Sequence, residues 1–246
     1  KDILSRVPKG YERRRAKARI EKTARVRGID LVTPEFTLDM IQQDLAETSY
    51  LSDAGELFDL DMGGAGMICD MSDAKAILAM FDTIEAEHGP VAALVNNAGV
   101  ALPGDFLTYD LEAFDKVIDI NLRGPYILSC EVARRLIAAE RSGRMVNISS
   151  VAATHYSGNG AALYSITKAA ISRMSEALAV EWSRFNINVN GIAPGLFKSE
   201  MTDGMLERVG DISQHFPRKR TGQPEQLDST LLYLCGPASE CVTGTV

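Results

Sequence analysis

Short apolar runs alternate along the chain with longer stretches in which an apolar residue recurs every three or four positions. The short runs predict strands, and they lie at residues 67–69, 91–95, 144–148 and 187–192. The longer stretches predict helices, and they lie at residues 73–88, 111–120, 125–141, 161–184 and 224–234. A last extended segment covers residues 242–246. Strand alternating with helix is typical of an α/β fold, so we predict a doubly wound, Rossmann-like parallel sheet covered by helices on both faces.

The first 56 residues do not follow this alternation, and we predict that they form a helical N-terminal extension to a catalytic domain at residues 57–246. Residues 1–28 carry eleven Lys or Arg against three acidic residues, a net charge of +8, which leaves −15 for the rest of the chain. Their apolar residues are few and small, which favours a solvated or partner-packed helix over one that binds nucleic acid or an anionic surface. A second helix is predicted at residues 33–46, because Thr-Pro-Glu is a typical helix start.

Composition narrows the classes of partner. The chain has 246 residues, of which 46% are hydrophobic and 24% charged, as in ordinary globular proteins. Its net charge of −7 argues against nucleic acid as the partner of the whole chain. No apolar run approaches the roughly 18 residues of a membrane span, and no signal peptide is evident, so we expect no membrane association. The four cysteines and three histidines show no metal-ligand spacing, and unpaired cysteines favour a reducing, cytoplasmic location.

Polar or glycine-containing turns follow four of the predicted strands. They are Cys69-Asp70, Asn96 to Gly99, Ser149-Ser150 and Pro194-Gly195. Each turn alone is ordinary loop chemistry, because Asn, Gly and Ser favour turns. The carboxyl ends of parallel strands meet at one edge of a sheet, however, and that edge is where such sheets bind ligands. The sequence therefore predicts a ligand site at this edge.

Tyr164 and Lys168 stand four residues apart, early in the helix predicted at residues 161–184. That spacing places a phenol and an ammonium side by side on one face of a helix. A nearby cation favours the phenolate, and a tyrosine tuned in this way can exchange a proton with a carbonyl or hydroxyl oxygen. The pair alone is more often an exposed helix face, so its weight depends on the turns that precede it.

Several short motifs occur in a fixed order from residue 63 to residue 246. They are an NNAG turn (Asn96 to Gly99), Asn121, an NISS strand end (Asn147 to Ser150), the YxxxK pair Tyr164 and Lys168, an NGIAPG turn (Asn190 to Gly195), and Val242-Thr243-Gly244. In this order and spacing the chain resembles the short-chain dehydrogenase/reductase family. Within that family it is most similar to the 3-oxoacyl carrier-protein reductases and to the sugar and polyol dehydrogenases.

The resemblance implies a catalytic group. Tyr164 would exchange the proton with the substrate oxygen, while Lys168 would hold the cofactor ribose and lower the pKa of the tyrosine. Ser150 would hydrogen-bond the same substrate oxygen, with Ser149 as the adjacent candidate. Asn121 would fix Lys168 through a water molecule; its alternative role is to stabilise a kink in a helix.

The resemblance also implies NAD or NADP as cofactor. The residues expected to contact it, besides Tyr164 and Lys168, are Asp70 at the adenine, Asn97, Ala98 and Gly99 at the adenosine ribose, and Pro194, Gly195 and Ser199 at the nicotinamide. The substrate would be a small alcohol or ketone, in a pocket flanked by His155, Tyr156, Phe197 and Met201. Helices 111–141 and 161–184 would form the faces of a homodimer or homotetramer. The alternative function is a catalytically inactive relative that acts as a structural or regulatory partner.

One family feature is missing from this sequence. The family begins with a strand and a glycine-rich turn of the TGxxxGxG kind, which holds the cofactor pyrophosphate at a helix N-terminus. The glycine cluster at residues 63–66 has no apolar strand before it. The first two strands are therefore not evident, and roughly 50 residues would be missing between Asp61 and Met62. Either the protein contains a segment at this point that the sequence does not show, or the polypeptide truly lacks it.

Overall fold

Three parallel strands form the centre of the molecule, in the order β3 (Ala93–Asn96), β4 (Gly143–Ile148) and β5 (Ile187–Ile192). The computed structural model describes residues 58–60, 64–105, 107–156, 158 and 160–246, so the helices predicted before residue 57 lie outside the described residues. Asn96 pairs with Asn147, which pairs with Gly191, so the carboxyl ends of the three strands are level. The predicted α/β fold with a parallel sheet is confirmed.

Helices follow the strands in alternation, and all of them except α7 overlap stretches predicted to be helical. They are α3 (Ala74–His88), α4 (Leu111–Ile118), α5 (Gly124–Ala138), α6 (Ala162–Trp182), α7 (Glu200–Val209) and α8 (Asp228–Cys235). Single 3-10 turns lie at Val151–Ala153, Ser183–Phe185, Ser213–His215, Pro224–Gln226 and Pro237–Ser239. None of the helices in the described ranges is both long enough and apolar enough to cross a lipid bilayer.

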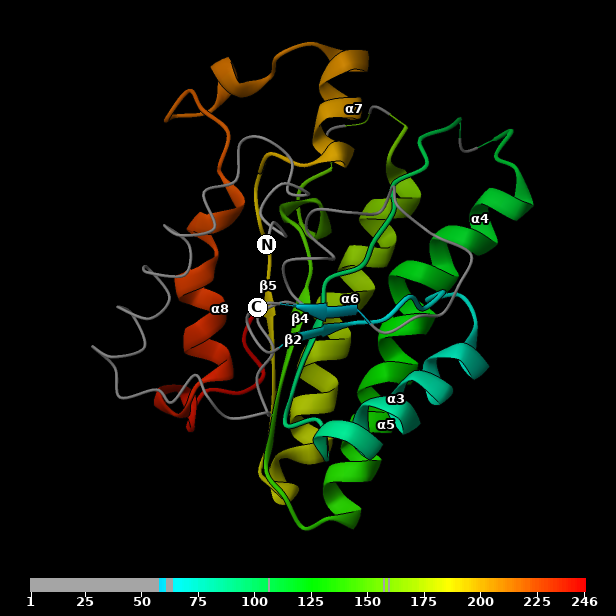
Figure 1. Ribbon diagram of the computed structural model, residues 1–246. Helices are drawn as coiled ribbons and strands as arrows, with labels where there is room; N and C mark the ends of the chain where they lie inside the picture. The colour runs from blue at the N-terminus through cyan, green and yellow to red at the C-terminus, as the bar shows by residue number, and fades with distance from the viewer. Residues whose placement is uncertain (1–57, 61–63, 106, 157, 159) are drawn as a thin grey trace, which may run out of the picture.

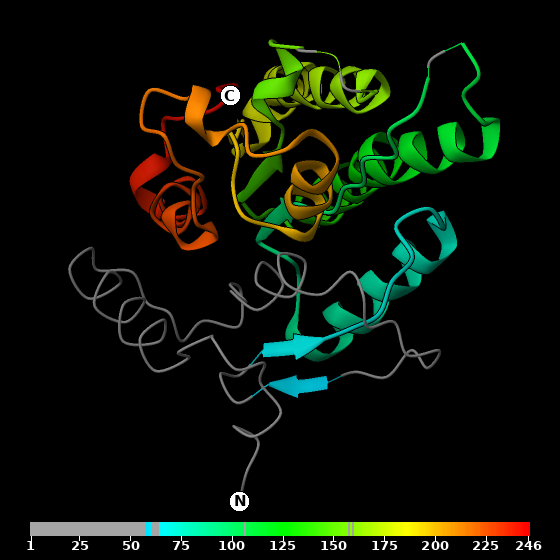
Figure 2. The ribbon, with the colours of Figure 1, turned by 90° about the horizontal axis from the view of Figure 1, so that it is seen from above.

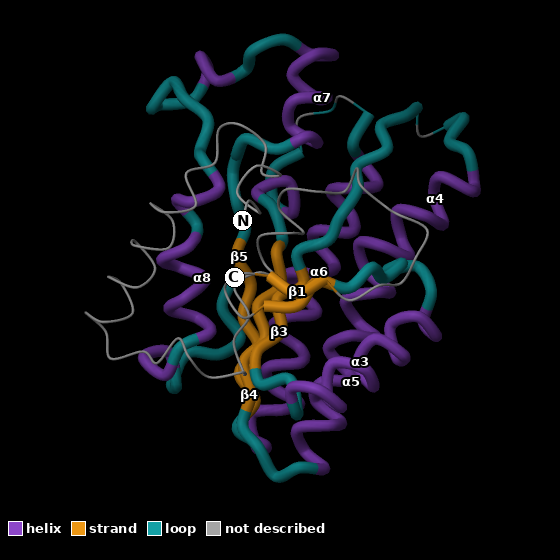
Figure 3. The backbone as a smooth tube through the Cα atoms, viewed as in Figure 1, coloured by secondary structure: helices purple, strands orange, loops and turns teal. Residues whose placement is uncertain are grey.

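The sheet has helices on both faces, as Figures 1 and 3 show. Successive side chains of a strand point to opposite faces, so Met145 and Val146 of β4 enter different cores. Met145 packs with residues of α3, α5 and α6, whereas Val146 packs with Leu231 and Leu234 of α8. This two-sided burial explains why the strands read as apolar runs rather than as an alternating pattern.

Helices α4 and α5 form one continuous helical run rather than the two separate helices that we predict from the sequence. The π-helical turn η2 (Asp119–Arg123) joins them and contains Asn121. Pro125 stands in the first turn of α5. Because proline has no backbone N–H, it cannot donate a hydrogen bond to the preceding helical turn. The wider π turn accommodates this proline without ending the helix, and it turns the Asn121 side chain inward, where it is buried.

The apolar run at residues 67–69 is not a strand, and this prediction is wrong. Instead β1 (Phe58–Leu60) and β2 (Gly64–Gly66) pair antiparallel in a separate two-stranded sheet, which Figure 2 shows apart from the parallel strands. Within the described ranges, β3 pairs only with β4. Residues 67–69 make no such pairing, and Met67 and Cys69 pack against the core from a loop.

The extended segment predicted at residues 242–246 runs beside β5 without forming a regular strand. Gly244 N–H donates to Val189 O (2.8 Å), and Gly191 N–H donates to Thr245 O (2.7 Å). The Asn190 side chain adds a hydrogen bond from Nδ2 to Val242 O (2.8 Å). The outer edge of β5 is thus covered by the chain's own last residues.

A buried chain of polar side chains crosses the sheet between α5 and α6. Asn96 Nδ2 donates to Ser129 Oγ (3.0 Å) and to Asn147 Oδ1 (2.7 Å), and Asn147 Nδ2 donates to Ser175 Oγ (2.9 Å). Asn147 is therefore fully bonded within this chain. Asn96 Oδ1, by contrast, is buried and has no hydrogen-bond partner in the part of the molecule that the structure describes. Because Nδ2 of Asn96 turns toward β4, this oxygen faces away from β4.

Candidate active site

Helix α6 brings Tyr164 and Lys168 together beside the end of β4. Lys168 Nζ lies 5.7 Å from the centre of the Tyr164 ring, as the four-residue spacing on a helix predicts. The Tyr164 side chain hydrogen-bonds Ser150, the second residue after β4. Ser150 Oγ also accepts a hydrogen bond from Ala152 N–H (3.1 Å) and so caps the turn Val151–Ala153, which fixes the hydroxyl in front of the phenol.

Lys168 is almost completely buried, with 4% of its surface exposed. Its Nζ donates a hydrogen bond to Ile148 O (2.7 Å), at the last residue of β4. Burial disfavours the charged ammonium and lowers the pKa of Lys168 to about 8. The lysine is therefore still charged at neutral pH but loses its proton in mildly alkaline solution.

Tyr164 differs from the sequence-based expectation. We predict from the sequence that Lys168 lowers the pKa of the phenol, but in the structure burial raises that pKa above its ordinary value. The hydrogen bond with Ser150 acts in the lowering direction and offsets only part of the rise. Two features explain the difference: the phenol is removed from water, and the lysine directs its N–H to a backbone carbonyl. At neutral pH the tyrosine is protonated and ready to act as an acid.

The two serines of the strand end face different partners. Ser150 points to Tyr164, whereas Ser149 Oγ donates to the backbone carbonyl of Lys168 (2.9 Å) and lies 2.6 Å from Ser172 Oγ. Ser149 is 2% exposed, so it is enclosed on the α6 side of β4. Of the two candidates, only Ser150 is placed beside the phenol.

Asn121 connects the turn after β3 to α6. Its Oδ1 accepts from Val100 N–H (2.8 Å), and its Nδ2 donates to Val100 O (2.8 Å) and to Thr167 Oγ1 (3.1 Å). These three bonds use the side-chain amide almost completely, and none of them reaches Lys168 directly. The side chain therefore holds the NNAG turn against the helix that carries Tyr164. Thr167 is a residue that our sequence interpretation missed; a hydroxyl on an otherwise apolar helix face was the available signal.

Gly99 lets the Lys168 ammonium and the Asn121 side chain pack closely against the turn after β3, whereas Gly195 faces open space beyond the end of β5. A Cβ at Gly99 would lie 3.3 Å from Lys168 Nζ and 3.5 Å from Asn121 Oδ1, so a side chain there would crowd both groups. A Cβ at Gly195 would meet nothing within 4 Å. Asn97, Ala98 and Pro194 are half-buried along the same edge, where Pro194 O accepts a hydrogen bond from Val151 N–H (3.0 Å). The ends of β3, β4 and β5 thus meet as predicted.

Two predicted cofactor contacts, Ser199 and Asp70, already bond within their own segments. Ser199 is the N-cap of α7, where its Oγ accepts from Thr202 N–H (3.2 Å); this capping serine was the sequence signal for a helix that we did not predict. Asp70 is exposed, and its Oδ1 accepts from Ser72 N–H (2.8 Å) and Ser72 Oγ (2.7 Å). These hydrogen bonds lower the pKa of Asp70. The structure does not join Asp70 to the Tyr164 group by any contact that it describes.

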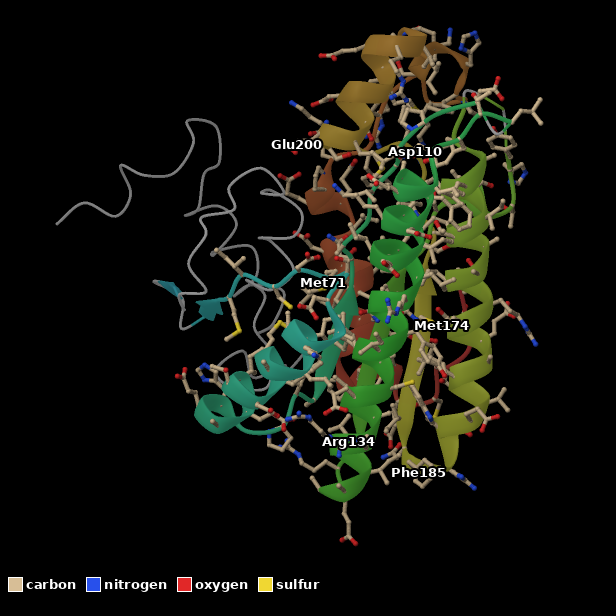
Figure 4. All side chains as sticks on the ribbon, turned by 90° about the vertical axis from the view of Figure 1, so that its right-hand side faces the viewer. Met71, Asp110, Arg134, Met174, Phe185 and Glu200 are labelled. Atoms are coloured by element: carbon tan, nitrogen blue, oxygen red, sulfur yellow. The ribbon has the colours of Figure 1, made fainter. Side chains whose placement is uncertain are left out.

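The predicted pocket residues lie near the same end of the sheet, on loops except for Met201, which is in α7. Figure 4 shows that Glu200 of α7 and Asp110 before α4 lie at one end of the molecule, and Arg134 and Phe185 at the other. His155, Tyr156 and Met201 are exposed, and His155 Nδ1 lies 2.9 Å from Thr154 Oγ1. Phe197 instead packs its ring on Gly222, where a Cβ would come within 2.6 Å of the ring.

Comparison with known proteins agrees with this geometry. A family model described as enoyl-(acyl carrier protein) reductase matches residues 35–246, and so begins inside the segment that we assign to the N-terminal extension. The 3-oxoacyl-(acyl-carrier-protein) reductase of Mycobacterium bovis is 32% identical over 182 residues, covering 74% of this chain and 73% of the relative. The chain belongs to the short-chain dehydrogenase/reductase family. This family consists of NAD(P)-dependent oxidoreductases.

Two solved structures of the same family are similar in fold. A short-chain type dehydrogenase/reductase from Mycobacterium marinum has a TM-score of 0.69 and 27% identity, covering 72% of this chain and 70% of that one. A gluconate 5-dehydrogenase from Burkholderia cenocepacia, solved in complex with NADP and tartrate, has a TM-score of 0.65 and 28% identity, covering 72% of this chain and 69% of that one. The similarity therefore spans the parallel sheet and its helices, and it leaves part of each relative unmatched.

The described residues fit one half of a nicotinamide dinucleotide. Lys168 offers a cation and Gly195 open space at the strand ends, which suits the nicotinamide and its ribose. The pyrophosphate needs backbone N–H groups at a helix N-terminus that follows a strand and a glycine-rich turn. Here the glycines at 64–66 form β2, and the next helix, α3, is capped by the carboxylate of Asp73, which accepts from Lys75 N–H (2.8 Å). An acidic cap repels phosphate, so the described residues do not fit this half.

Proposed function

We propose that this chain is an NAD(P)-dependent oxidoreductase that transfers a hydride between nicotinamide and a small alcohol or ketone, with Tyr164 as the general acid and base. The observation that carries the proposal is the turn of α6 in which the Tyr164 side chain bonds Ser150 and the Lys168 ammonium lies 5.7 Å from the centre of the Tyr164 ring. The names of the relatives support the reaction class, because they are dehydrogenases and reductases.

Each residue of the group has a separate task in carbonyl reduction. Bound NADH or NADPH would supply the hydride. As the substrate oxygen gains negative charge, the Ser150 hydroxyl donates a hydrogen bond to it and the Tyr164 phenol transfers its proton to it. Tyr164 is left as a phenolate, which the hydrogen bond with Ser150 stabilises. Asn121 keeps the NNAG turn in place through its two bonds to Val100.

Replacement of the phenolic hydroxyl tests this assignment. Carbonyl reduction is measured by loss of nicotinamide absorbance with 3-oxoacyl thioesters, oxidised sugar acids and cyclic ketones, using NADH and NADPH in turn. Tyr164→Phe is expected to lower turnover about 10²- to 10⁴-fold, the usual contribution of a positioned proton donor. Tyr126→Phe, at an exposed tyrosine of α5, is the matched control and keeps full turnover. Full turnover in Tyr164→Phe would show that the proton comes from another group.

We also propose a homodimer or homotetramer formed through α4, α5 and α6, and a cytoplasmic location. These helices expose large apolar side chains, namely Leu111, Phe114, Tyr126, Ile166 and Val180. None of the four cysteines forms a disulfide, which suits a reducing compartment. Sedimentation velocity tests the assembly, and a monomer at every concentration would contradict it. The inactive alternative is not proposed, because the side chains expected for catalysis are present and the relatives named above are enzymes.

A further inference from the structure

Three consecutive residues at the end of β4 each bond a different atom of Tyr164 or Lys168. They are Ile148, Ser149 and Ser150. Ile148 O accepts from Lys168 Nζ (2.7 Å), and Ser149 Oγ donates to the backbone carbonyl of Lys168 (2.9 Å). The next residue, Ser150, bonds the Tyr164 side chain. A shift of α6 along β4 would therefore disturb both reacting side chains at once. Of these contacts, the Ser149 bond is the one that fixes the helix backbone itself.

Ser172 completes the contact made by Ser149. Its Oγ lies 2.6 Å from Ser149 Oγ and 3.2 Å from Lys168 O. Each hydroxyl has a single proton, so one serine donates to the carbonyl while the other donates to the first serine or shares the carbonyl. Ser149, Ser172 and the Lys168 carbonyl form a three-membered unit, which we call the serine clamp. Because Ser149 N–H also donates to Ile192 O (2.7 Å), the clamp is anchored to β5 as well.

We propose that Ser149 and Ser172 are positioning residues, which hold the Lys168 backbone so that its ammonium stays enclosed beside Ile148 and Tyr164 stays in reach of Ser150. The inference rests on the proposed function, in that these side chains serve catalysis. It adds a pair of residues that we do not place in contact with substrate or cofactor. The competing explanation is that the two serines serve only the stability of the fold. In that case, replacing any buried serine of α6 would have the same effects.

Ser175 provides the matched control for that explanation. It lies on the same helix, is fully buried, donates from Oγ to Ile171 O (2.9 Å) and accepts from Asn147 Nδ2 (2.9 Å). Ser175→Ala therefore removes a buried hydroxyl that also ties α6 to β4, but one that does not contact Lys168. A loss of packing alone affects Ser149→Ala and Ser175→Ala alike.

The deciding measurement is the ionisation of Lys168, followed by NMR in protein labelled with ¹³C at the lysine side-chain ε carbon. The Lys168 signal is assigned by its absence in Lys168→Met. In the unaltered protein its titration midpoint is expected near 8, the value that burial gives this pKa. In Ser149→Ala and in the milder Ser172→Ala, water reaches the ammonium and the midpoint rises toward that of a free lysine. Ser172→Thr keeps the hydroxyl and restores the original midpoint, and Ser175→Ala leaves it unchanged.

Turnover provides the second readout. Both clamp variants are expected to lower kcat about tenfold with little change in KM, and the double variant is no worse than the single ones because the two serines act as one unit. An unchanged Lys168 midpoint in Ser149→Ala, with thermal stability lowered as in Ser175→Ala, would overturn the clamp. If no substrate is turned over at all, the proposed function fails while the titration still decides the clamp.

Discussion

The two edges of the parallel sheet differ in how completely their polar groups find hydrogen-bond partners. At the β4–β5 end, the strand edge is covered by residues 242–246, and the Tyr164–Lys168 turn is held by Ile148, Ser149 and Ser150. At the β3 end, the described residues supply no further strand, and Asn96 Oδ1 is buried without a partner. The first region is the one that handles the proton in our proposal. The second is where the family's phosphate-binding strand and turn would be expected.

This difference teaches that the two tasks of such an enzyme can be separated in the fold. In our proposal, proton transfer uses residues on α6 and at the end of β4, all of which lie in the described ranges. Dinucleotide binding needs a different strand, turn and helix start, which the described residues do not provide. The predictions below test whether the first region suffices for proton transfer and whether the second lacks a site for the cofactor phosphates.

The largest effect is expected at Lys168. Lys168→Met is expected to lower turnover about 10²- to 10³-fold, because the cofactor ribose loses the cation that we expect to hold it. The same change should stabilise the fold by about 1–2 kcal/mol at neutral pH, because an enclosed ammonium is replaced by an apolar chain of similar length. Turnover assays and thermal unfolding measure the two effects. Lys116→Met, at an exposed lysine of α4, is the control and should change neither.

The gain in stability should depend on pH in a defined direction. The pKa of Lys168 in the fold is about 8, below its ordinary value of 10.5, so the unfolded chain binds the proton more tightly. The native protein is therefore penalised most below pH 8 and recovers as pH rises from about 8 to 10.5. The advantage of Lys168→Met should be fully present below pH 8 and disappear over that window. A stability difference that grows with pH would contradict this account of the buried charge.

The buried asparagines offer the next largest effect and compare the two regions directly. Asn147→Ala should lower the free energy of unfolding by about 3 kcal/mol, because it leaves Asn96 Nδ2 and Ser175 Oγ short of partners. Asn96→Ala should cost only about 1–2 kcal/mol, since it also removes an oxygen that has no partner. Urea unfolding of both variants measures the difference. Equal losses would show that Asn96 Oδ1 is satisfied by residues outside the described ranges.

Much of the β4–β5 region could be predicted from the sequence, because its signals are local. Tyr164 and Lys168 meet through a helical spacing, and the strands of residues 144–148 and 187–192 are short buried runs between helices. The π turn at Asn121 could not be predicted, since it depends on how Pro125 and the Asn121 bonds to Val100 are accommodated together. The raised pKa of Tyr164 likewise reflects burial by distant segments, which spacing along a helix does not show.

The β3 region was harder for the same physical reason. The run at residues 67–69 has the composition of a strand, but a strand forms only where a neighbour accepts its backbone hydrogen bonds. In the described ranges the run pairs with no other strand, so it is a loop. Asn96 and Asn147 were recognised from the sequence as parts of motifs, whereas the network that joins them through Ser129 and Ser175 depends on how the helices pack.

A smaller effect is expected from pH on the direction of the reaction. Carbonyl reduction uses the protonated phenol, and burial raises the pKa of Tyr164, so the acid form persists through neutral pH. Reduction should be flat at neutral pH and fall as pH rises through about 8, where Lys168 loses its charge. Alcohol oxidation needs the phenolate, so its rate should increase by up to about tenfold per pH unit above neutrality. Paired pH profiles of kcat/KM in both directions measure this. A reduction rate that increases with pH would contradict the assignment of Tyr164 as the acid.

The smallest effect is the sharpest test of the incomplete region. If the described residues hold only the nicotinamide and its ribose, reduced nicotinamide mononucleotide should bind within about tenfold of NADH, because the pyrophosphate and adenosine add few contacts. In a protein with a complete phosphate-binding turn, charged hydrogen bonds from a helix N-terminus would favour NADH much more strongly. Quenching of protein fluorescence by each ligand measures the two affinities, with Tyr233→Phe, at a half-buried tyrosine of α8, as a control that should leave both unchanged within about twofold. A preference for NADH of 100-fold or more, roughly 2.7 kcal/mol, would show that residues outside the described ranges complete the phosphate site.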